Sequence, residues 1–185
     1  HFSADGKPLR LWRMRDSRAG NPKGLCTLPN GNLLVCDTHY SRVLEVTLDG
    51  ETVKVWGGEE RFARPLSCCA GARRGAAYIV DYGFRNDRVL KYALDGTFLR
   101  EWGGFGAEPG QLQRPSGVAV DGGGFVYVAD ACNHRIQKFD SDGRFLASFG
   151  RYGRAAGELC YPYDVACAPD GTVYVAEFNN HRVSV

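Results

Sequence analysis

Four acid–arginine pairs recur along the chain and are the residues whose type and spacing could do chemistry. They are Asp37/Arg42, Asp81/Arg88, Asp130/Arg135 and Glu177/Arg182. A ring of converging carboxylates would suit general acid–base catalysis, in which a positioned carboxyl group moves a proton. Active sites are normally asymmetric, however, whereas these pairs occur once in every repeat of the sequence. We therefore interpret each acid as the partner of its own arginine, with the pair holding a turn.

The histidines and cysteines give no ligand set. The four histidines are His1, His39, His134 and His181. The chain has no CxxC motif and no Cys/His quartet, and the neighbouring Cys68 and Cys69 do not suit a tetrahedral zinc site. No nucleophile–base pair can be built from the sequence either. We therefore expect no metal, no cofactor and no catalytic residue.

Most of the seven cysteines lie in apolar, strand-like stretches, where a thiol acts as a small hydrophobic group. These are Cys26, Cys36, Cys68, Cys69 and Cys167. The odd count leaves at least one thiol free or paired to another chain. This usage favours a reduced, cytoplasmic setting. In an oxidising compartment Cys132 and Cys160 could pair, provided that their Cα atoms lie within about 7 Å.

The elements that must position these groups come from an internal repeat. Pro22, Pro65, Pro115 and Pro162 open four similar segments and are 43, 50 and 47 residues apart. This period is typical of propeller blades. We interpret residues 1–185 as one domain with repeats at about 21–63, 64–113, 114–160 and 161–185 plus 1–20.

Each repeat has the pattern of four short antiparallel strands. In the third repeat, strands at 117–120, 125–129 and 136–139 are followed by a fourth that closes on Phe149–Gly150. Asp-Gly and Asn-Gly turns separate such runs because glycine tolerates positive φ. No segment has a convincing 3.6-residue apolar period. The fold class predicted is all-β, a propeller with four blades of four antiparallel strands.

The two ends of the chain are complementary in phase. The fourth repeat stops at 181–185, within its third strand, and residues 2–12 repeat the pattern of 139–149. We therefore expect the N-terminal strand to join the C-terminal blade and close the ring. The alternative is a fragment of a larger propeller. Trp12, Trp56, Trp102 and Phe149 share one repeat position, which indicates packing between blades.

The segment RPSGVAVDGGGFVYVADACNHRIQKFDSDGRFLASFG (114–150) resembles an NHL repeat. The resemblance covers nearly the whole chain and is weakest in the second repeat, where 81–88 holds two extra residues. NHL propellers are usually six-bladed, so the count of four departs from the family. The resemblance implies a scaffold for protein partners, and some NHL domains bind RNA. The α-amidating lyase is a related propeller, and 130–136 and 159–166 resemble its repeats; Ala131 stands where that family has a catalytic tyrosine.

Charge and aromatic residues select one rim of the ring. A net charge of +2 predicts no polyanion partner by itself. The links between blades carry a positive excess and the hairpin turns a negative one. Arginine with aromatic rings is typical of protein interfaces and also of sites that stack single-stranded bases. The binding surface predicted on the basic rim comprises Arg13, Arg15, Arg18, His39, Tyr40, Tyr82, Phe84, His134, Arg151, Tyr152, Arg154, Phe178 and His181.

These observations leave three functions open. The favoured hypothesis is a non-enzymatic scaffold that binds another protein through the basic, aromatic rim, as part of a larger complex. RNA binding by the same face is the first alternative and predicts an affinity that falls steeply with salt. An enzyme related to the amidating lyase is the second. No apolar run reaches the roughly 18–20 residues of a membrane helix, so no membrane insertion is expected.

Overall fold

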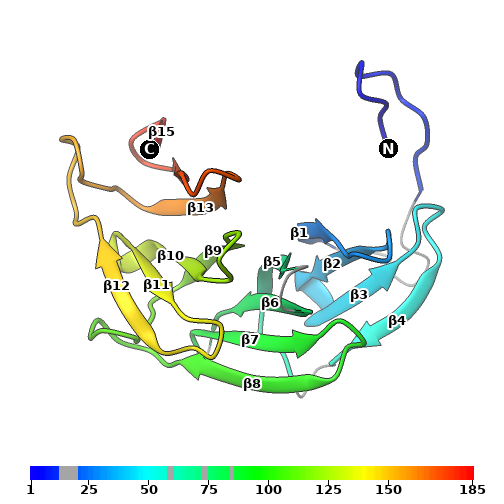
Figure 1. Cartoon of the computed structure of the whole chain (residues 1–185), viewed down its shortest axis with the longest axis horizontal. Helices are drawn as coiled ribbons and strands as arrows, with labels where there is room; N and C mark the ends of the chain where they lie inside the picture. The colour runs from blue at the N-terminus through cyan, green and yellow to red at the C-terminus, as the bar shows by residue number, and fades with distance from the viewer. Residues whose placement is uncertain (13–20, 58–60, 72–74, 84–85) are drawn as a thin grey trace.

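The structure, a computed structural model, describes residues 1–12, 21–57, 61–71, 75–83 and 86–185. Four antiparallel sheets stand side by side around an arc (Figure 1). Blade 1 contains β1 (Pro22–Thr27), β2 (Leu33–Asp37), β3 (Arg42–Val46) and β4 (Thr52–Trp56), and blade 2 contains β5 (Pro65–Gly71), β6 (Ala76–Asp81), β7 (Arg88–Ala93) and β8 (Phe98–Gly103). Blade 3 contains β9 (Pro115–Val120), β10 (Val126–Asp130), β11 (Arg135–Phe139) and β12 (Phe145–Phe149), and blade 4 contains β13 (Pro162–Cys167), β14 (Val173–Glu177) and β15 (Arg182–Ser184). The predicted all-β fold with four propeller blades is confirmed.

Tight glycine turns set the strand register. In blade 3 the Asp140 N–H donates to the Arg144 carbonyl and the Gly143 N–H to the Asp140 carbonyl, at 3.0 and 3.1 Å. Gly143 has φ +83°, a conformation open to glycine without steric cost. Within blade 3 each strand pairs in sequence order, with Ile136 of β11 opposite Ala129 of β10 and Phe149 of β12.

Short 3-10 turns carry the chain from the second strand to the third. They are η1 (Thr38–Tyr40) and η3 (Ala131–Asn133), and both end on a left-handed residue, Ser41 at φ 49° and His134 at φ 55°. Among the described residues these two short elements are the helical structure. They lie on the same rim as the links between blades, so this rim carries the irregular backbone.

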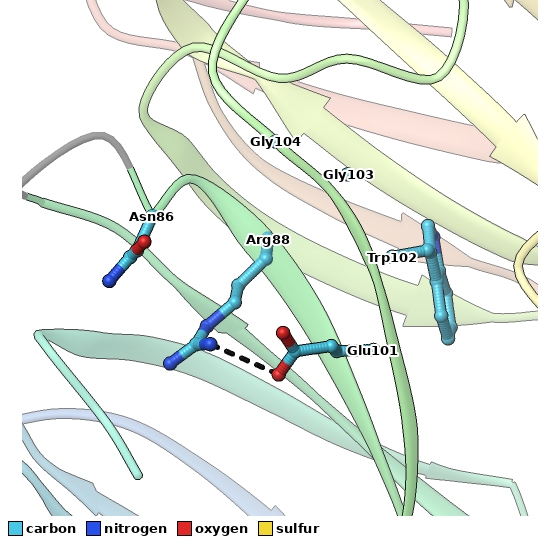
Figure 2. Close-up of a pocket in the computed structure, with 6 residues that line it drawn as sticks. All are labelled: Asn86, Arg88, Glu101, Trp102, Gly103 and Gly104. Atoms are coloured by element: carbon cyan, nitrogen blue, oxygen red, sulfur yellow. Dashed lines mark hydrogen bonds and ion pairs between the residues drawn. The ribbon is translucent and has the colours of Figure 1, made fainter. Parts of the chain in front are cut away.

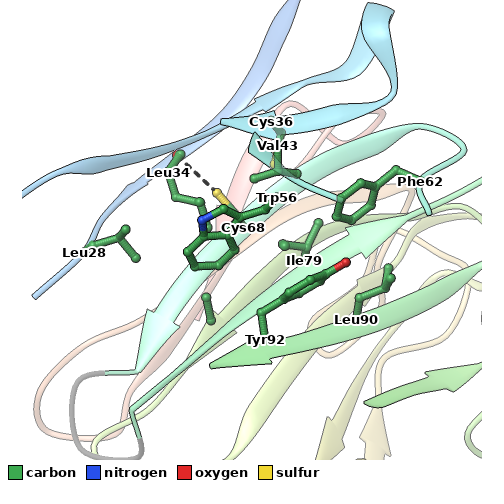
Figure 3. Close-up of a cluster of buried hydrophobic side chains, with 11 residues drawn as sticks. Leu28, Leu34, Cys36, Val43, Trp56, Phe62, Cys68, Ile79, Leu90 and Tyr92 are labelled. Carbon is green, nitrogen blue, oxygen red and sulfur yellow. Dashed lines mark hydrogen bonds between the residues drawn. The ribbon is translucent and has the colours of Figure 1, made fainter. Parts of the chain in front are cut away.

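The hydrophobic core lies between neighbouring blades. Figure 3 shows the cluster between blades 1 and 2, where Trp56 and Tyr92 lie beside Ile79 and Cys68. A second cluster joins blades 2 and 3 around Phe139, and a third joins blades 3 and 4. Burial of each blade's faces therefore depends on the adjacent blade, and dry aromatic packing supplies most of the driving force.

Small residues on the innermost strands let the blades approach each other. A Cβ added to Gly24 would lie 2.5 Å from the Leu66 carbonyl oxygen, and one added to Gly117 would lie 2.7 Å from the Asp164 Cα. These atoms belong to the backbone of the next blade and cannot move aside. Glycine at these two positions therefore sets how closely β1 packs on β5 and β9 on β13.

The predicted ring closure is wrong. The last sheet has three strands, β13–β14–β15, and the N-terminal segment does not extend it. Figure 1 places the two ends of the chain at opposite ends of the arc. Instead, Arg10 forms an ion pair with Asp49, and Trp12 contacts Gly50, in the β3–β4 turn of blade 1. The repeat period indicates the phase of the two ends, but the angle between blades decides whether they meet.

The aromatic residues that close each fourth strand pack as predicted. Trp56 covers Gly96 of blade 2 and Trp102 covers Gly143 of blade 3, each at a hairpin turn. Trp12 covers Gly50 in the same manner. Phe149 shares their repeat position but is 42% exposed, because the described part of blade 4 has no corresponding turn.

Candidate binding surface on the link rim

Buried acids anchor the links between blades. Asp130 is fully buried and accepts hydrogen bonds from the Gln113 N–H at 2.7 Å, from Arg135 Nε at 2.8 Å and from the Asn133 and Gln137 side-chain amides. The Arg135 guanidinium in turn donates to the Glu108 and Gln111 carbonyls. The acid and its arginine thus hold a link in place rather than face a substrate.

The same arrangement recurs in the other blades and confirms the structural interpretation of the acid–arginine pairs. The ion pairs are Arg42–Asp37 at 3.0 Å, Arg88–Asp81 at 3.2 Å, Arg135–Asp130 at 2.8 Å and Arg182–Glu177 at 2.6 Å. Burial raises the pKa of Asp81 and of Asp130 despite their hydrogen bonds. At Glu177 burial also acts to raise the pKa, but hydrogen bonds from Ser184, Arg182 and the Cys160 N–H outweigh it and lower the pKa.

Anchoring fixes the residue that precedes each repeat proline. The Arg64 N–H donates to Asp81, the Arg114 N–H to Asp87 at 2.9 Å and the Tyr161 N–H to His134 Nδ1 at 3.1 Å. Arg114 and Tyr161 have φ of +56° and +57°, in the left-handed region. A non-glycine residue there carries a backbone cost of order 1 kcal/mol. These N–H contacts hold that conformation and fix where the two side chains project.

The side chains fixed in this way form an alternating series, which we call the arginine–aromatic ladder. It comprises Arg64, Tyr82, Arg114, Tyr161, Phe178 and Tyr163. The guanidinium carbons of Arg64 and Arg114 lie 5.9 and 5.5 Å from the Tyr82 ring centroid. Arg114 also lies 5.7 Å from the Tyr161 ring. These separations are within the range of cation–π attraction.

The ladder ends in an aromatic group on blade 4. Phe178 is 64% exposed, and its ring centroid lies 6.1 Å from that of Tyr161 and 6.3 Å from that of Tyr163. Burial and the nearby Cys132 thiol raise the pKa of Tyr161, so its hydroxyl stays a hydrogen-bond donor at neutral pH. Stacked cations and rings therefore run from blade 2 to blade 4 along the link rim.

The ladder brings together two of the residues predicted from sequence, Tyr82 and Phe178. Two other predicted residues form a separate pair on blade 1, where His39 and Tyr40 meet edge to face at 4.9 Å. His134 and Tyr152 form a similar pair at 4.9 Å on blade 3, with Tyr152 70% exposed.

The remaining predicted residues divide into two groups. The Arg151 guanidinium pairs with Glu158 at 3.2 Å, the Arg154 carbonyl accepts from Arg182, and His181 is exposed in the left-handed region. Arg13, Arg15, Arg18 and Phe84 lie outside the described residues. These two groups add neither a rung to the ladder nor a contact with it in the described part of the chain.

Sequence reasoning missed the other members of the ladder. Arg64, Arg114 and Tyr161 each directly precede the proline that opens a repeat, and Tyr163 follows Pro162. That fixed place in the repeat was the available signal. A search for exposed loop aromatics passes over it, because these residues belong to the link rather than to the turn between second and third strands.

Figure 2 shows a pocket of about 240 Å³ on blade 2, lined by Asn86, Arg88, Glu101, Trp102, Gly103 and Gly104. The Arg88 guanidinium in it is already bound to Asp81, Glu101 and the Arg61 carbonyl. The same contacts hold a link in the other blades, so we assign this pocket a structural role.

All seven cysteines are free thiols, and those predicted to lie in strands are buried or half-buried there. Pairing of Cys132 with Cys160 under oxidising conditions stays a prediction. Within the described ranges, no three His, Cys, Asp or Glu side chains are grouped so as to hold a metal ion. The described residues also contain no helix of the length and apolar character that would cross a bilayer.

Comparison with known proteins identifies the repeat. The NHL repeat family model matches residues 112–139 and 159–185, which belong to blades 3 and 4. The predicted NHL resemblance is therefore confirmed. No curated protein matches the sequence.

Solved structures share the fold at low identity. A chain in a crystal structure of a nidogen/laminin complex is 19% identical with a TM-score of 0.77, over 97% of this chain and 63% of that one. Virginiamycin B lyase from Staphylococcus aureus is 16% identical with a TM-score of 0.70, over 98% and 57%. A streptogramin B lyase is 16% identical with a TM-score of 0.69, over 89% and 50%. This chain spans less than two thirds of each, and the likeness is one of fold alone.

Proposed function

We propose that this chain is a non-enzymatic binding module that takes an acidic segment of another protein on the arginine–aromatic ladder. The carrying observation is the state of the two ladder arginines. Among the described residues, neither Arg64 nor Arg114 has a carboxylate partner, and both side chains lie at the surface. Arg88, Arg135 and Arg182, in contrast, are each bound to a buried acid.

A carboxylate is the ligand that such an arginine fits best. The guanidinium presents a planar fork of donors that matches a carboxylate in two parallel hydrogen bonds. Arginine and tyrosine are also the residues on which interface energy concentrates. Tyr82, Tyr161 and Phe178 supply apolar contact area beside the charge, as an acidic segment carrying aromatic or aliphatic residues would need.

The geometry favours protein over single-stranded RNA. Bases stack on open aromatic faces, whereas guanidinium groups already lie over the rings of Tyr82 and Tyr161. The chain also carries a net charge of only +2, which provides little counterion release on binding a polyanion. One structure of this fold comes from a nidogen/laminin complex, an assembly of proteins.

Direct binding tests the proposal. Fluorescein-labelled 12-residue peptides rich in Glu with interspersed Tyr or Leu, their Lys-for-Glu counterparts, and a 12-nucleotide poly-U RNA are titrated with the chain and followed by anisotropy. We expect binding of the acidic peptides alone, weakened about tenfold or more by Arg114→Gln. Arg144→Gln is the matched control, because Arg144 is exposed at a hairpin turn and paired with Asp140. Tighter binding of poly-U, lost in Arg114→Gln, would overturn the proposal.

A capture experiment checks the result in a complex mixture. The immobilised chain is exposed to cell extract with and without nuclease, next to the Arg114→Gln variant. Retained protein that withstands nuclease and is lost in the variant supports a protein partner. A signal that disappears with nuclease contradicts it.

A further inference from the structure

The two ends of the arc expose positions that are buried in every other blade. On the second strand, the position two residues before the alanine or cysteine that precedes the anchoring acid faces the following blade. Its exposure is 0% at Leu34, 0% at Tyr78 and 6% at Tyr127, but 41% at Tyr174 of blade 4. Blade 4 thus presents a finished blade-packing face with nothing on it in the described structure.

Blade 1 presents the matching face. On the first strand, one position faces the preceding blade, and its exposure is 5% at Cys68, 4% at Val118 and 5% at Val165. At Leu25, the equivalent residue of blade 1, it is 67%. The clusters around Val118 and Val165 show the use of this position, since Val118 packs with Tyr78 and Val165 with Tyr127. Leu25 therefore has the type and the orientation to pack on a tyrosine in the place of Tyr174.

The N-terminal residues carry the rest of the blade that blade 4 lacks. The Ser3 N–H donates to the Lys7 carbonyl and the Gly6 N–H to the Ser3 carbonyl, the pattern of the β11–β12 turn around Gly143. Gly6 has φ +81°, as against +83° at Gly143. Residues 1–12 thus form a third-to-fourth-strand turn and a fourth strand, while the described blade 4 stops at its third strand.

One empty seat and one uncovered ring match these two ends. An aromatic residue covers the turn glycine at Gly50, Gly96 and Gly143, but a Cβ at Gly6 would meet nothing within 4 Å. Phe149 of blade 3 is the aromatic residue of that series without a glycine to cover. In a completed blade 4, Phe149 would lie over Gly6 as Trp102 lies over Gly143.

We propose that two copies of this chain join head to tail, so that residues 2–12 of each copy complete blade 4 of the other and blade 1 packs on it. Leu25 of one copy then packs on Tyr174 and Ala176 of its partner, and Phe149 covers the partner's Gly6. In the interface between blades 3 and 4, Gly117 lies against Tyr163 and Asp164. By the same repeat geometry Asp164 of one copy faces Lys23 and Gly24 of the other, which places opposite charges together.

This assembly is closed. Each interface joins two different surfaces, and a heterologous interface forms a ring when the rotation closes and a filament when it does not. Two arcs of four blades give eight, the upper end of the usual propeller range. The inference concerns the flanks of the arc and is independent of the ladder, which lies on the rim.

The mass in solution tests the inference first. Native mass spectrometry and light scattering are expected to give about 41 kDa, twice the chain mass of 20.3 kDa. A species of 20.3 kDa at all concentrations up to about 100 μM would overturn it, as would open-ended polymers or a dimer that the variants below leave intact. A protein held at about 41 kDa with intact ladder binding supports this inference and the proposed function separately, because each has its own variants.

Complementary variants test the head-to-tail arrangement. Leu25→Lys and Tyr174→Glu alter residues that are exposed in the single chain, so each variant is expected to keep the wild-type circular dichroism and to raise the dimer dissociation constant about 30-fold or more. Mixed together they should dimerise again, because one interface then pairs the new lysine with the new glutamate and the other is wild type. A mixture that stays monomeric contradicts the arrangement.

Leu99→Lys is the matched control, since Leu99 is 49% exposed on β8, an outer strand away from both flanks. It should leave the mass unchanged. Dimer loss in this variant would show that any added surface charge disrupts association, and would count against the assigned flanks.

Discussion

Blade 3 and blade 4 carry nearly the same sequence motifs and the same hydrogen bonds, yet differ in burial. Each holds its link through an acid, an arginine and an asparagine: Asp130, Arg135 and Asn133 in one, Glu177, Arg182 and Asn180 in the other. Blade 3 has a neighbour on both sides, and its Tyr127 is 6% exposed; the equivalent Tyr174 of blade 4 is 41% exposed. A blade therefore makes its own backbone structure, whereas its hydrophobic burial comes from its neighbours.

The largest expected difference is between the two anchoring acids. Asp130→Ala should lower the free energy of unfolding by about 3–5 kcal/mol, because it leaves the buried Gln137 amide, the Gln113 N–H and a charged arginine without their acceptor. Glu177→Ala, in the half-open blade, should cost about 1–2 kcal/mol less, since water reaches the released donors. Urea unfolding of both variants measures this, and equal losses would show that the flank does not weaken the anchor.

The second comparison concerns the innermost strands. Gly117→Ala should cost about 1–3 kcal/mol, because the new methyl group meets the backbone of β13 and only a shift of the blade relieves it. Asp164→Ala, on the open flank, should change stability by less than about 0.5 kcal/mol at concentrations where the chain is monomeric. Thermal unfolding gives both values. A neutral Gly117→Ala would mean that the blades are packed more loosely than the structure shows.

The smallest effect is a pH dependence of opposite sign in the two blades. The pKa of Glu177 is lowered from its ordinary value of 4.5, so its contribution to stability is complete above that value and is lost as the pH falls through the lowered pKa. The pKa of Asp130 is raised from 3.8 by burial, so its contribution is greatest below that value and is lost as the pH rises through the raised pKa.

Two neutral variants separate these contributions. Between pH 7 and pH 3, Glu177→Gln should lose less stability than the wild type, and Asp130→Asn should lose more. Urea midpoints at pH 7, 5 and 3 check the sign. The same sign in both variants would remove the electrostatic difference between the blades.

Sequence reasoning predicted the parts of the structure that are local. Glycine turns such as Asp142–Gly143 and the alternation along Val126–Asp130 predicted the strands, and the recurrence of Asp130 with Arg135 predicted their pairing. The ladder was missed in part, because Arg114 and Tyr161 project where they do only through left-handed backbone held by Asp87 and His134. Ring closure was predicted wrongly, since the period of a repeat contains no measure of the angle between sheets.

The anchoring hydrogen bond between a link and its blade also bears on how the chain folds. Gln113 donates to Asp130 and Cys160 to Glu177, so each bond spans 17 residues. Closing so short a loop costs little entropy, and the closure needs no later part of the chain. A nascent polypeptide can therefore order one repeat at a time as synthesis proceeds, and each finished sheet offers a template for the next. Amide protons should show the same gradient, with slow hydrogen exchange in β6 and β10 and the fastest in β14 and β15.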